Sequence, residues 1–274
     1  YQPEMKEILP GSGIYAESGP KVSGIMDAIW PGGWGTFKVP YTYEVTKQTP
    51  EEAVVKMTCE VDDWKLERTV ALQEGTACLD ITVQLTYISD TKDRKAYWQQ
   101  TILRLADTLL SMAGDDSEIL YMPARRETEA VQGRTQPVDR SHVFPRNPEF
   151  QRNVFLPPAA PWMAAIDKTA KTGLAQFYTL PDFPGKAVFY SNSASNADFY
   201  TMELITSPRP YNKGTSHTFE TRMAVFAGLT NLHLVTPDYA LALLDVPEEP
   251  IPADSFRLKA AVSGFRADGG VTIS

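Results

Sequence analysis

The sequence predicts an all-β fold, a large sandwich of two antiparallel sheets. Apolar and polar residues alternate with period two along most of the chain, turn residues interrupt this alternation at short spacing, and helical periodicity is scarce. The clearest segment is 78–88, where Leu79, Ile81 and Val83 alternate with polar residues, as in a half-buried strand. About a dozen such segments exceed what a small immunoglobulin-like module needs, so they favour two broad sheets.

The predicted strands follow one another from residue 39 onward. Strands at 39–46, 53–61, 65–72 and 78–88 are joined by short turns, as in antiparallel hairpins. Further strands are predicted at 96–106, 117–122, 162–168, 172–179, 186–191, 198–206 and 217–227.

Two short helices are also expected. Thr236 has the character of an N-cap and Pro237 that of a first helical residue, which predicts a helix at 237–244. The second is expected near 3–9.

One domain is expected over residues 1–246. The chain has 274 residues, 43% of them hydrophobic, which is enough for a large core. Residues 247–252 are read as a linker. The part from 247 to 274 is therefore expected to be a linker followed by C-terminal strands, or the stub of a further domain.

Charge and hydropathy reduce the number of functional classes that fit the chain. The net charge is −8 and the pI is about 5.0, which argues against a nucleic-acid partner. No apolar run approaches the roughly 20 residues that span a bilayer, so no membrane span is expected. The chain begins at Tyr1, which fits a mature or trimmed chain.

The two cysteines, Cys59 and Cys78, form no metal motif. The alternation in their strands puts the two thiols on opposite faces of the sheet, which favours two free thiols over a disulfide. Three histidines are too few to favour a multi-histidine metal site. We therefore expect neither a metal nor a cofactor.

Residues 123–161 interrupt the strand pattern with a long, polar, proline-rich segment. Loops of this length are usually functional or disordered. The segment carries Arg125, Arg126 and Arg140, and arginine is suited to bidentate binding of a carboxylate, sulfate or phosphate. His142 lies among them and is a candidate acid or ligand-binding group. The alternative is that these arginines pair with acids of the same loop.

Glu203 is the first candidate for a functional residue, because it lies within the apolar strand predicted at 198–206. A lone acid there is costly unless it is solvated, paired or used. A carboxylate that is buried without a cation has a raised pKa, which suits a general acid or base. The alternative is a structural salt bridge to Arg222 on the next strand.

In the order of their elements and in several short sequence segments, roughly residues 35–230 resemble the galactose mutarotase-like supersandwich group. Three pairs of sequence segments carry the resemblance. The first is Leu66–Leu72 followed by Cys78–Val83, and the second is Trp162–Asp167 followed by Gly173–Ala175. The third is Tyr200–Leu204 followed by Pro208, Lys213-Gly214 and the strand from Thr218. The resemblance implies a mutarotase-like sandwich and a carbohydrate ligand. It places Glu203 where mutarotases have the glutamate that acts as base on the anomeric hydroxyl.

His142 could take the role of the mutarotase histidine, although the Asn-His pair typical of epimerases is absent. With the arginines, the resemblance favours an acidic sugar or polysaccharide held by Arg125, Arg126 and Arg140. Trp34, Trp162 and Tyr178 are the candidate aromatic contacts.

Whether the chain is an enzyme stays open, and an epimerase, lyase or hydrolase would each fit. The alternatives are a non-catalytic carbohydrate-binding or structural domain of a secreted multidomain protein and, ranked third, a protein-interaction module. The resemblance implies a periplasmic or extracellular location. Oligomeric state is not predicted.

Overall fold

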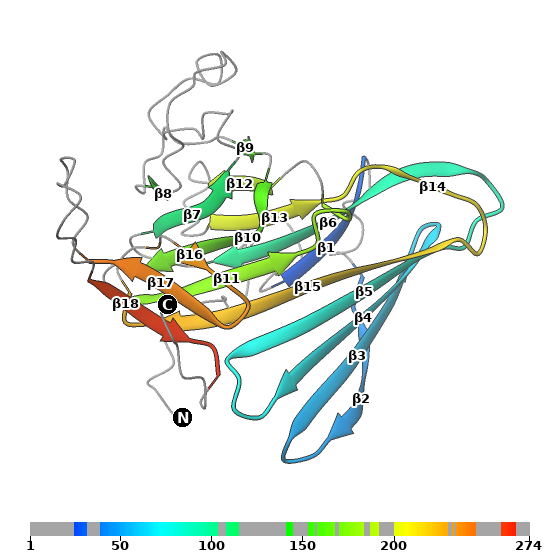
Figure 1. Ribbon diagram of the computed structural model, residues 1–274. Helices are drawn as coiled ribbons and strands as arrows, with labels where there is room; N and C mark the ends of the chain where they lie inside the picture. Colours follow the sequence, from blue (N-terminus) through cyan, green and yellow to red (C-terminus); the bar gives the residue numbers. More distant parts are fainter. Residues whose placement is uncertain are drawn as a thin grey trace, which may run out of the picture.

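The computed structural model of the protein describes residues 25–31, 39–103, 108–114, 141–144, 153–156, 158–167, 170–183, 187–191, 200–229, 232, 234–244 and 259–266. Its regular elements over these residues are all β-strands, and their pairings are antiparallel. The predicted all-β sandwich is therefore confirmed (Figure 1).

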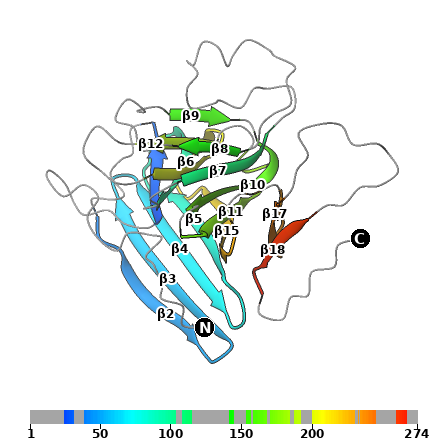
Figure 2. The same ribbon diagram turned by 90° about the vertical axis from the view of Figure 1, so that its left-hand side faces the viewer.

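The larger sheet has nine strands in the order β2-β3-β4-β5-β15-β11-β10-β7-β8. Their bounds are β2 Thr42–Gln48, β3 Glu52–Val61, β4 Trp64–Gln73, β5 Cys78–Tyr87, β7 Thr108–Gly114, β8 Ser141–Phe144, β10 Pro158–Asp167, β11 Thr172–Tyr178 and β15 Ser216–Ala227. The first four strands extend beyond the smaller sheet, as the two views in Figures 1 and 2 show.

The smaller sheet has six strands. Five follow the order β1-β6-β13-β12-β9, and β14 also pairs with β6. Their bounds are β1 Ile25–Trp30, β6 Asp93–Leu103, β9 Asn153–Leu156, β12 Ala187–Ser191, β13 Tyr200–Ile205 and β14 Arg209–Tyr211. A third sheet has the order β16-β17-β18, with bounds Leu234–Val235, Tyr239–Leu243 and Ala260–Gly264.

Two hydrophobic clusters lie on opposite faces of the nine-stranded sheet. The first fills the space between the two large sheets and includes Leu66, Val83, Tyr97 and Met202. The second joins the outer face of the nine-stranded sheet to the three-stranded sheet. The middle of the large sheet is thus covered on both sides, which explains its nearly continuous apolar character there.

Most predicted strands from residue 39 onward match observed strands to within a few residues. The helix expected at 237–244 is wrong, because β17 occupies Tyr239–Leu243. The Thr236 hydroxyl accepts hydrogen bonds from the backbone N–H groups of Asp238 and Tyr239, so it forms a turn before a strand and does not cap a helix. The strand expected at 117–122 and the helix near 3–9 lie outside the described residues.

Both cysteines are free and buried. Cys59 belongs to the first hydrophobic cluster and Cys78 to the second, so the two thiols lie on opposite faces of the sheet, as the alternation predicts. At the C-terminal end of the described chain, β18 pairs with β17. The domain boundary expected at 247 stays a prediction.

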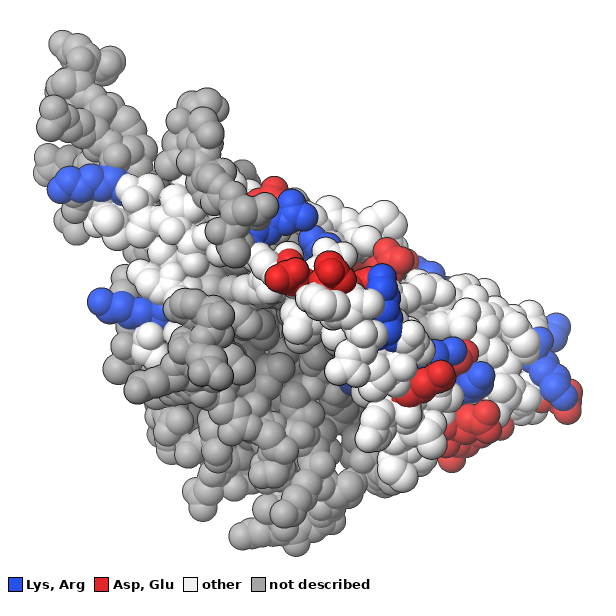
Figure 3. Space-filling model, turned by 90° about the horizontal axis from the view of Figure 1, so that it is seen from below, with Lys and Arg blue, Asp and Glu red and all other residues white. Residues whose placement is uncertain are grey.

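Figure 3 shows acidic and basic side chains interspersed on the described surface seen from below. On the outer face of β3 and β4, for example, the Glu67 carboxylate pairs with the ammonium groups of Lys56, at 2.5 Å, and Lys65, at 3.3 Å. Over the described residues, no helix is long and apolar enough to cross a membrane.

Candidate functional site

Glu203 lies in β13 and is only 1% exposed. Its neighbours Met202 and Leu204 belong to the cluster between the two large sheets. Because successive side chains of a strand point to opposite faces, Glu203 points away from the nine-stranded sheet. The acid that the sequence singled out is therefore on the outer face of the smaller sheet.

The outer face carries two tryptophans beside this acid. In register, Glu203 lies opposite Gln100 of β6, and Gln100 lies opposite Met26 of β1. Trp98 occupies the next row, and its ring meets that of Trp30 edge to face with 5.5 Å between the centroids. We call this surface the tryptophan face; it comprises Met26, Ala28, Trp30, Ala96, Trp98, Gln100, Glu203 and Ile205.

Exposure on the tryptophan face is concentrated at its tryptophans, because Ala28 and Ala96 beside them are each only 1% exposed. Glu203 and Gln100 are buried, Trp98 is half-buried, and Trp30 is 44% exposed. The face thus has an accessible aromatic end and an enclosed polar end. Binding sites for small molecules commonly combine a mostly apolar lining with a few placed polar groups in this way.

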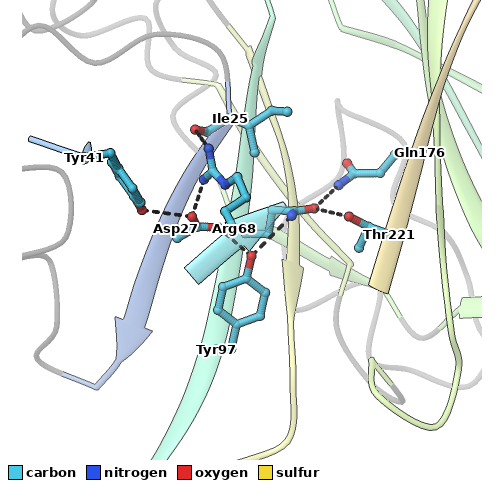
Figure 4. A network of polar contacts seen from close by, with 8 residues as sticks. Ile25, Asp27, Tyr41, Arg68, Tyr97, Gln176 and Thr221 are labelled. Carbon is cyan, nitrogen blue, oxygen red and sulfur yellow. Dashed lines mark hydrogen bonds and ion pairs between the residues drawn. The ribbon is translucent and has the colours of Figure 1, made fainter. Parts of the chain in front are cut away.

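A polar network lies on the inner side of the same strands (Figure 4). The Asp27 carboxylate of β1 forms an ion pair with the Arg68 guanidinium of β4, on the opposite sheet. Asp27 also accepts hydrogen bonds from the hydroxyls of Tyr97, at 2.6 Å, and Tyr41, at 3.0 Å. Arg68 donates a second bond to the Ile25 carbonyl at 3.1 Å. These contacts tie the two sheets together.

The network continues between the sheets through amide side chains. The Gln99 amide donates to the Tyr97 hydroxyl at 3.2 Å, and its carbonyl accepts from Gln176 at 2.7 Å and from Thr221 at 3.0 Å. Thr101 donates to the Gln176 carbonyl at 3.4 Å. A buried amide that is bonded at both ends fixes the position of its strand.

The electrostatics of the network favour fixed charges and neutral phenols. Burial, and then the Asp27 carboxylate, raise the pKa values of Tyr97 and Tyr41 far above the ordinary value of a tyrosine. The attraction of Asp27 keeps the pKa of Arg68 above its ordinary value although burial opposes it. These groups hold their protons firmly, so the network suits positioning better than proton transfer.

The other candidates named from the sequence are dispersed. Trp162 is buried in the second hydrophobic cluster and Tyr178 in the first, where its hydroxyl donates to the Trp162 carbonyl at 3.5 Å. Burial raises the pKa of Tyr178. Both residues belong to the nine-stranded sheet, so they do not meet Glu203 on the tryptophan face. Their role in ligand binding stays a prediction.

His142 lies in β8 at an edge of the nine-stranded sheet, opposite Leu110 of β7. The structure describes its backbone but not its side chain, and Arg125, Arg126, Arg140 and Trp34 lie outside the described residues. Arg222, the alternative salt-bridge partner named for Glu203, pairs with another acid. Its guanidinium donates to the Asp80 carboxylate at 2.5 Å, across β15 and β5.

Sequence reasoning missed the network around Asp27 and Arg68. A signal was present, since the alternation in β4 puts Arg68 on the same face as Leu66 and Val70. A charged residue on an apolar strand face points to a buried partner. The described residues contain no group of three or more histidine, cysteine or acidic side chains that could hold a metal.

A comparison with protein-family models found no match, and no curated protein matches the chain. Solved structures do match. A protein described as a "putative aldose 1-epimerase" from Klebsiella pneumoniae shares 11% identity, with a TM-score of 0.52 over 78% of this chain and 67% of that one. A TPR-domain containing protein from Parabacteroides distasonis shares 13% identity, with a TM-score of 0.52 over 86% of this chain and 42% of that one.

A galactose mutarotase-like protein from Clostridium acetobutylicum has a TM-score of 0.49 and 8% identity, over 71% of this chain and 69% of that one. Identities this low establish the fold alone. The chain therefore shares the fold of the protein described as a "putative aldose 1-epimerase", and this fold is the large all-β sandwich that the sequence predicts.

Proposed function

We propose that the tryptophan face binds a carbohydrate, and that the ligand is an acidic sugar. The observation that carries this proposal is the pairing, on one sheet face, of an exposed tryptophan with a buried acid and amide. The apolar side of a sugar ring packs well on an indole ring, while hydroxyl groups need a few fixed polar partners. The fold supports the proposal, since its structural neighbours include the protein described as a "putative aldose 1-epimerase".

Glu203 is the proposed acid–base residue if the domain is an enzyme. Its row adjoins that of Trp98, so the carboxylate lies one row inside the proposed stacking surface. An enclosed carboxylate is suited to taking or giving a proton at a sugar hydroxyl. His142 and the arginines of residues 123–161 remain candidates for a second proton-transfer group and for further contacts to the acid.

Binding can be tested by titration calorimetry with neutral and uronic oligosaccharides. Trp30→Ala is expected to weaken binding by roughly tenfold, because it removes the exposed stacking surface. Tyr43→Ala is the matched control, since Tyr43 is 77% exposed but lies in β2 of the other sheet. Equal affinity of wild type and Trp30→Ala would overturn the tryptophan face as the site.

Turnover separates an enzyme from a binding domain. NMR of the sugars that bind reports anomer exchange, and ultraviolet absorbance reports the unsaturated product of a lyase. For an enzyme, Glu203→Gln is expected to abolish turnover while leaving affinity nearly unchanged. Binding without turnover in the wild type would instead establish the non-catalytic alternative, which the missing Asn-His pair favours.

A further inference from the structure

We infer that Arg94 binds the negatively charged group of the ligand at the exposed end of the tryptophan face. This inference rests on the proposed function and deepens it, since it names the residue that distinguishes an acidic sugar from a neutral one. Arg94 was not among the candidates suggested by the sequence, and it lies far along the chain from the arginines of residues 123–161.

The register places Arg94 beside Trp30. Arg94, Ala96 and Trp98 alternate along β6 and so share the outer face. Trp30 of β1 lies directly opposite Ala96, which makes Trp98 and Arg94 its two diagonal neighbours. Diagonal Cβ atoms are about 7–8 Å apart, within reach of long side chains. The exposed indole therefore has a second indole on one side. On the other side it has Arg94, whose side chain is long enough to reach a ligand stacked on the indole.

The neighbouring cations, Lys95 and Arg209, already have partners within the protein. The Lys95 ammonium lies 3.0 Å from the Pro31 carbonyl and 3.4 Å from the Asp93 carboxylate. The Arg209 guanidinium lies 2.6 Å from the Asp182 carboxylate. The Asp93 and Asp182 carboxylates are thus the partners of these two cations, and alternation along β6 puts Lys95 on the same face as Tyr97, opposite the tryptophan face.

Arg94 differs from these two cations. Its side chain is exposed, and none of the described acids forms an ion pair with its guanidinium. The acid next to it in sequence, Asp93, accepts from the Arg94 backbone N–H at 2.7 Å and faces Lys95. Opposite Arg94 in β14 is Pro210, which brings no charge. The guanidinium is thus available to an external anion.

The chemistry of the ligand follows from this arrangement. A ring stacked on Trp30 would present its substituents toward Arg94, and a guanidinium binds planar oxyanions through two parallel N–H groups. The ligand is a sugar with an anionic substituent, either the carboxylate of a uronic acid or a sulfate. Both have the geometry that arginine recognises.

Calorimetry with matched sugars tests the assignment, using a neutral oligosaccharide, its uronic counterpart and its sulfated counterpart. Wild type is expected to prefer at least one charged form. Arg94→Gln is expected to lower that affinity by roughly three- to tenfold and to leave the neutral sugar unchanged, because an exposed charge contact is worth little more than this. The preference should also weaken with added salt in wild type and hardly at all in the variant.

Arg222→Gln is the matched control, because Arg222 is equally cationic but pairs with Asp80 on the nine-stranded sheet. The charged form whose affinity falls identifies the anionic group. An unchanged preference in Arg94→Gln would overturn the assignment, and so would an equal loss for the neutral sugar. If no sugar binds to wild type, the proposed function itself fails. If Trp30→Ala abolishes binding while Arg94→Gln keeps the preference, only the inference fails.

Discussion

At the scale of single residues, the buried Asp27–Arg68 ion pair is expected to be costly to disturb. Both side chains are buried, and the carboxylate receives two further hydrogen bonds from Tyr97 and Tyr41. Breaking such a pair by removing one charge leaves the other buried without compensation. Asp27→Asn is expected to lower the free energy of unfolding by about 3–5 kcal/mol, measured by urea denaturation.

A pair on the outer face of the nine-stranded sheet provides the control. The Arg222 Nε and Asp80 Oδ1 atoms are 2.5 Å apart, but the two side chains are 42% and 38% exposed. Solvent screens such a pair, so Asp80→Asn is expected to cost under about 1 kcal/mol. Similar losses in the two variants would show that burial does not set the strength of the inner pair.

Alkaline pH is expected to weaken the same network. The pKa of Tyr97 in the folded protein is raised well above 10.0 by burial and by Asp27, while an unfolded tyrosine titrates near that value. The unfolded state therefore loses a proton first, and the stabilisation, complete below pH 10, falls as pH rises beyond it. Urea denaturation at increasing pH should show this fall.

Tyr97→Phe is expected to reduce the alkaline loss, because one of the two phenols that face Asp27 is gone. Tyr239→Phe is a suitable comparison, since Tyr239 lies in the three-stranded sheet and outside this network. A steep alkaline loss of equal size in wild type and Tyr97→Phe would contradict the assignment to Tyr97.

At the scale of elements, the sequence predicts strands well where one face is apolar and the other polar. In β5, buried Ile81, Val83 and Leu85 alternate with more exposed neighbours, and the predicted bounds differ by one residue. In β1 the signal fails because four successive residues, Met26 to Ile29, are buried, so no alternation of polarity is present. Both faces of β1 are covered by other parts of the fold, and a local sequence pattern does not show this.

The candidate site shows the same limit. Glu203 could be singled out because an acid in an apolar strand is a local feature. The neighbours on its face come from strands about 100 residues or more away in the chain, and their register is set by pairing across β6. A single sequence contains no direct signal for that register. Trp30, Trp98 and Arg94 could therefore not be grouped with Glu203 in advance.

Gly173 of β11 leaves room for the ring of Phe226, its partner in β15. A Cβ atom at this position would run into the ring of Phe226 and lie 2.7 Å from the Ala165 carbonyl. Gly173→Ala is expected to cost about 1–3 kcal/mol through overpacking, measured by chemical denaturation.

Combining Gly173→Ala with Phe226→Leu should restore part of this loss, because the smaller side chain makes room. The test is a double-mutant cycle with the two single variants. A double variant whose losses simply add would show that the clash with Phe226 is not the cause.

At the scale of the whole molecule, the nine-stranded sheet carries a packed layer on each face. Inter-sheet polar bonds add to the first hydrophobic cluster, while the second joins Phe226 and Ala224 of β15 to residues of the three-stranded sheet. Because both clusters share β10, β11 and β15, damage to one layer should reach the other. The three layers should then unfold as a single unit.

Phe265, just after β18, tests this coupling. It is buried against Phe177 and Phe226, and its N–H donates to the Asp238 carbonyl. Its own carbonyl accepts from the N–H of Ala77, the residue just before β5 of the nine-stranded sheet. Phe265→Ala is expected to cost about 3–5 kcal/mol. Val262→Ala, at a half-buried position in β18, is expected to cost under about 1.5 kcal/mol.

The shape of the urea unfolding transition shows whether the three sheets unfold together. In Phe265→Ala, far-ultraviolet circular dichroism and tryptophan fluorescence should shift together to a lower urea midpoint, because Trp64 and Trp162 report the first and second clusters respectively. An early partial transition followed by an unshifted main one would mean that the third sheet folds apart from the sandwich. That outcome would support a boundary near residue 247, whereas one displaced transition would extend the cooperative unit to β18.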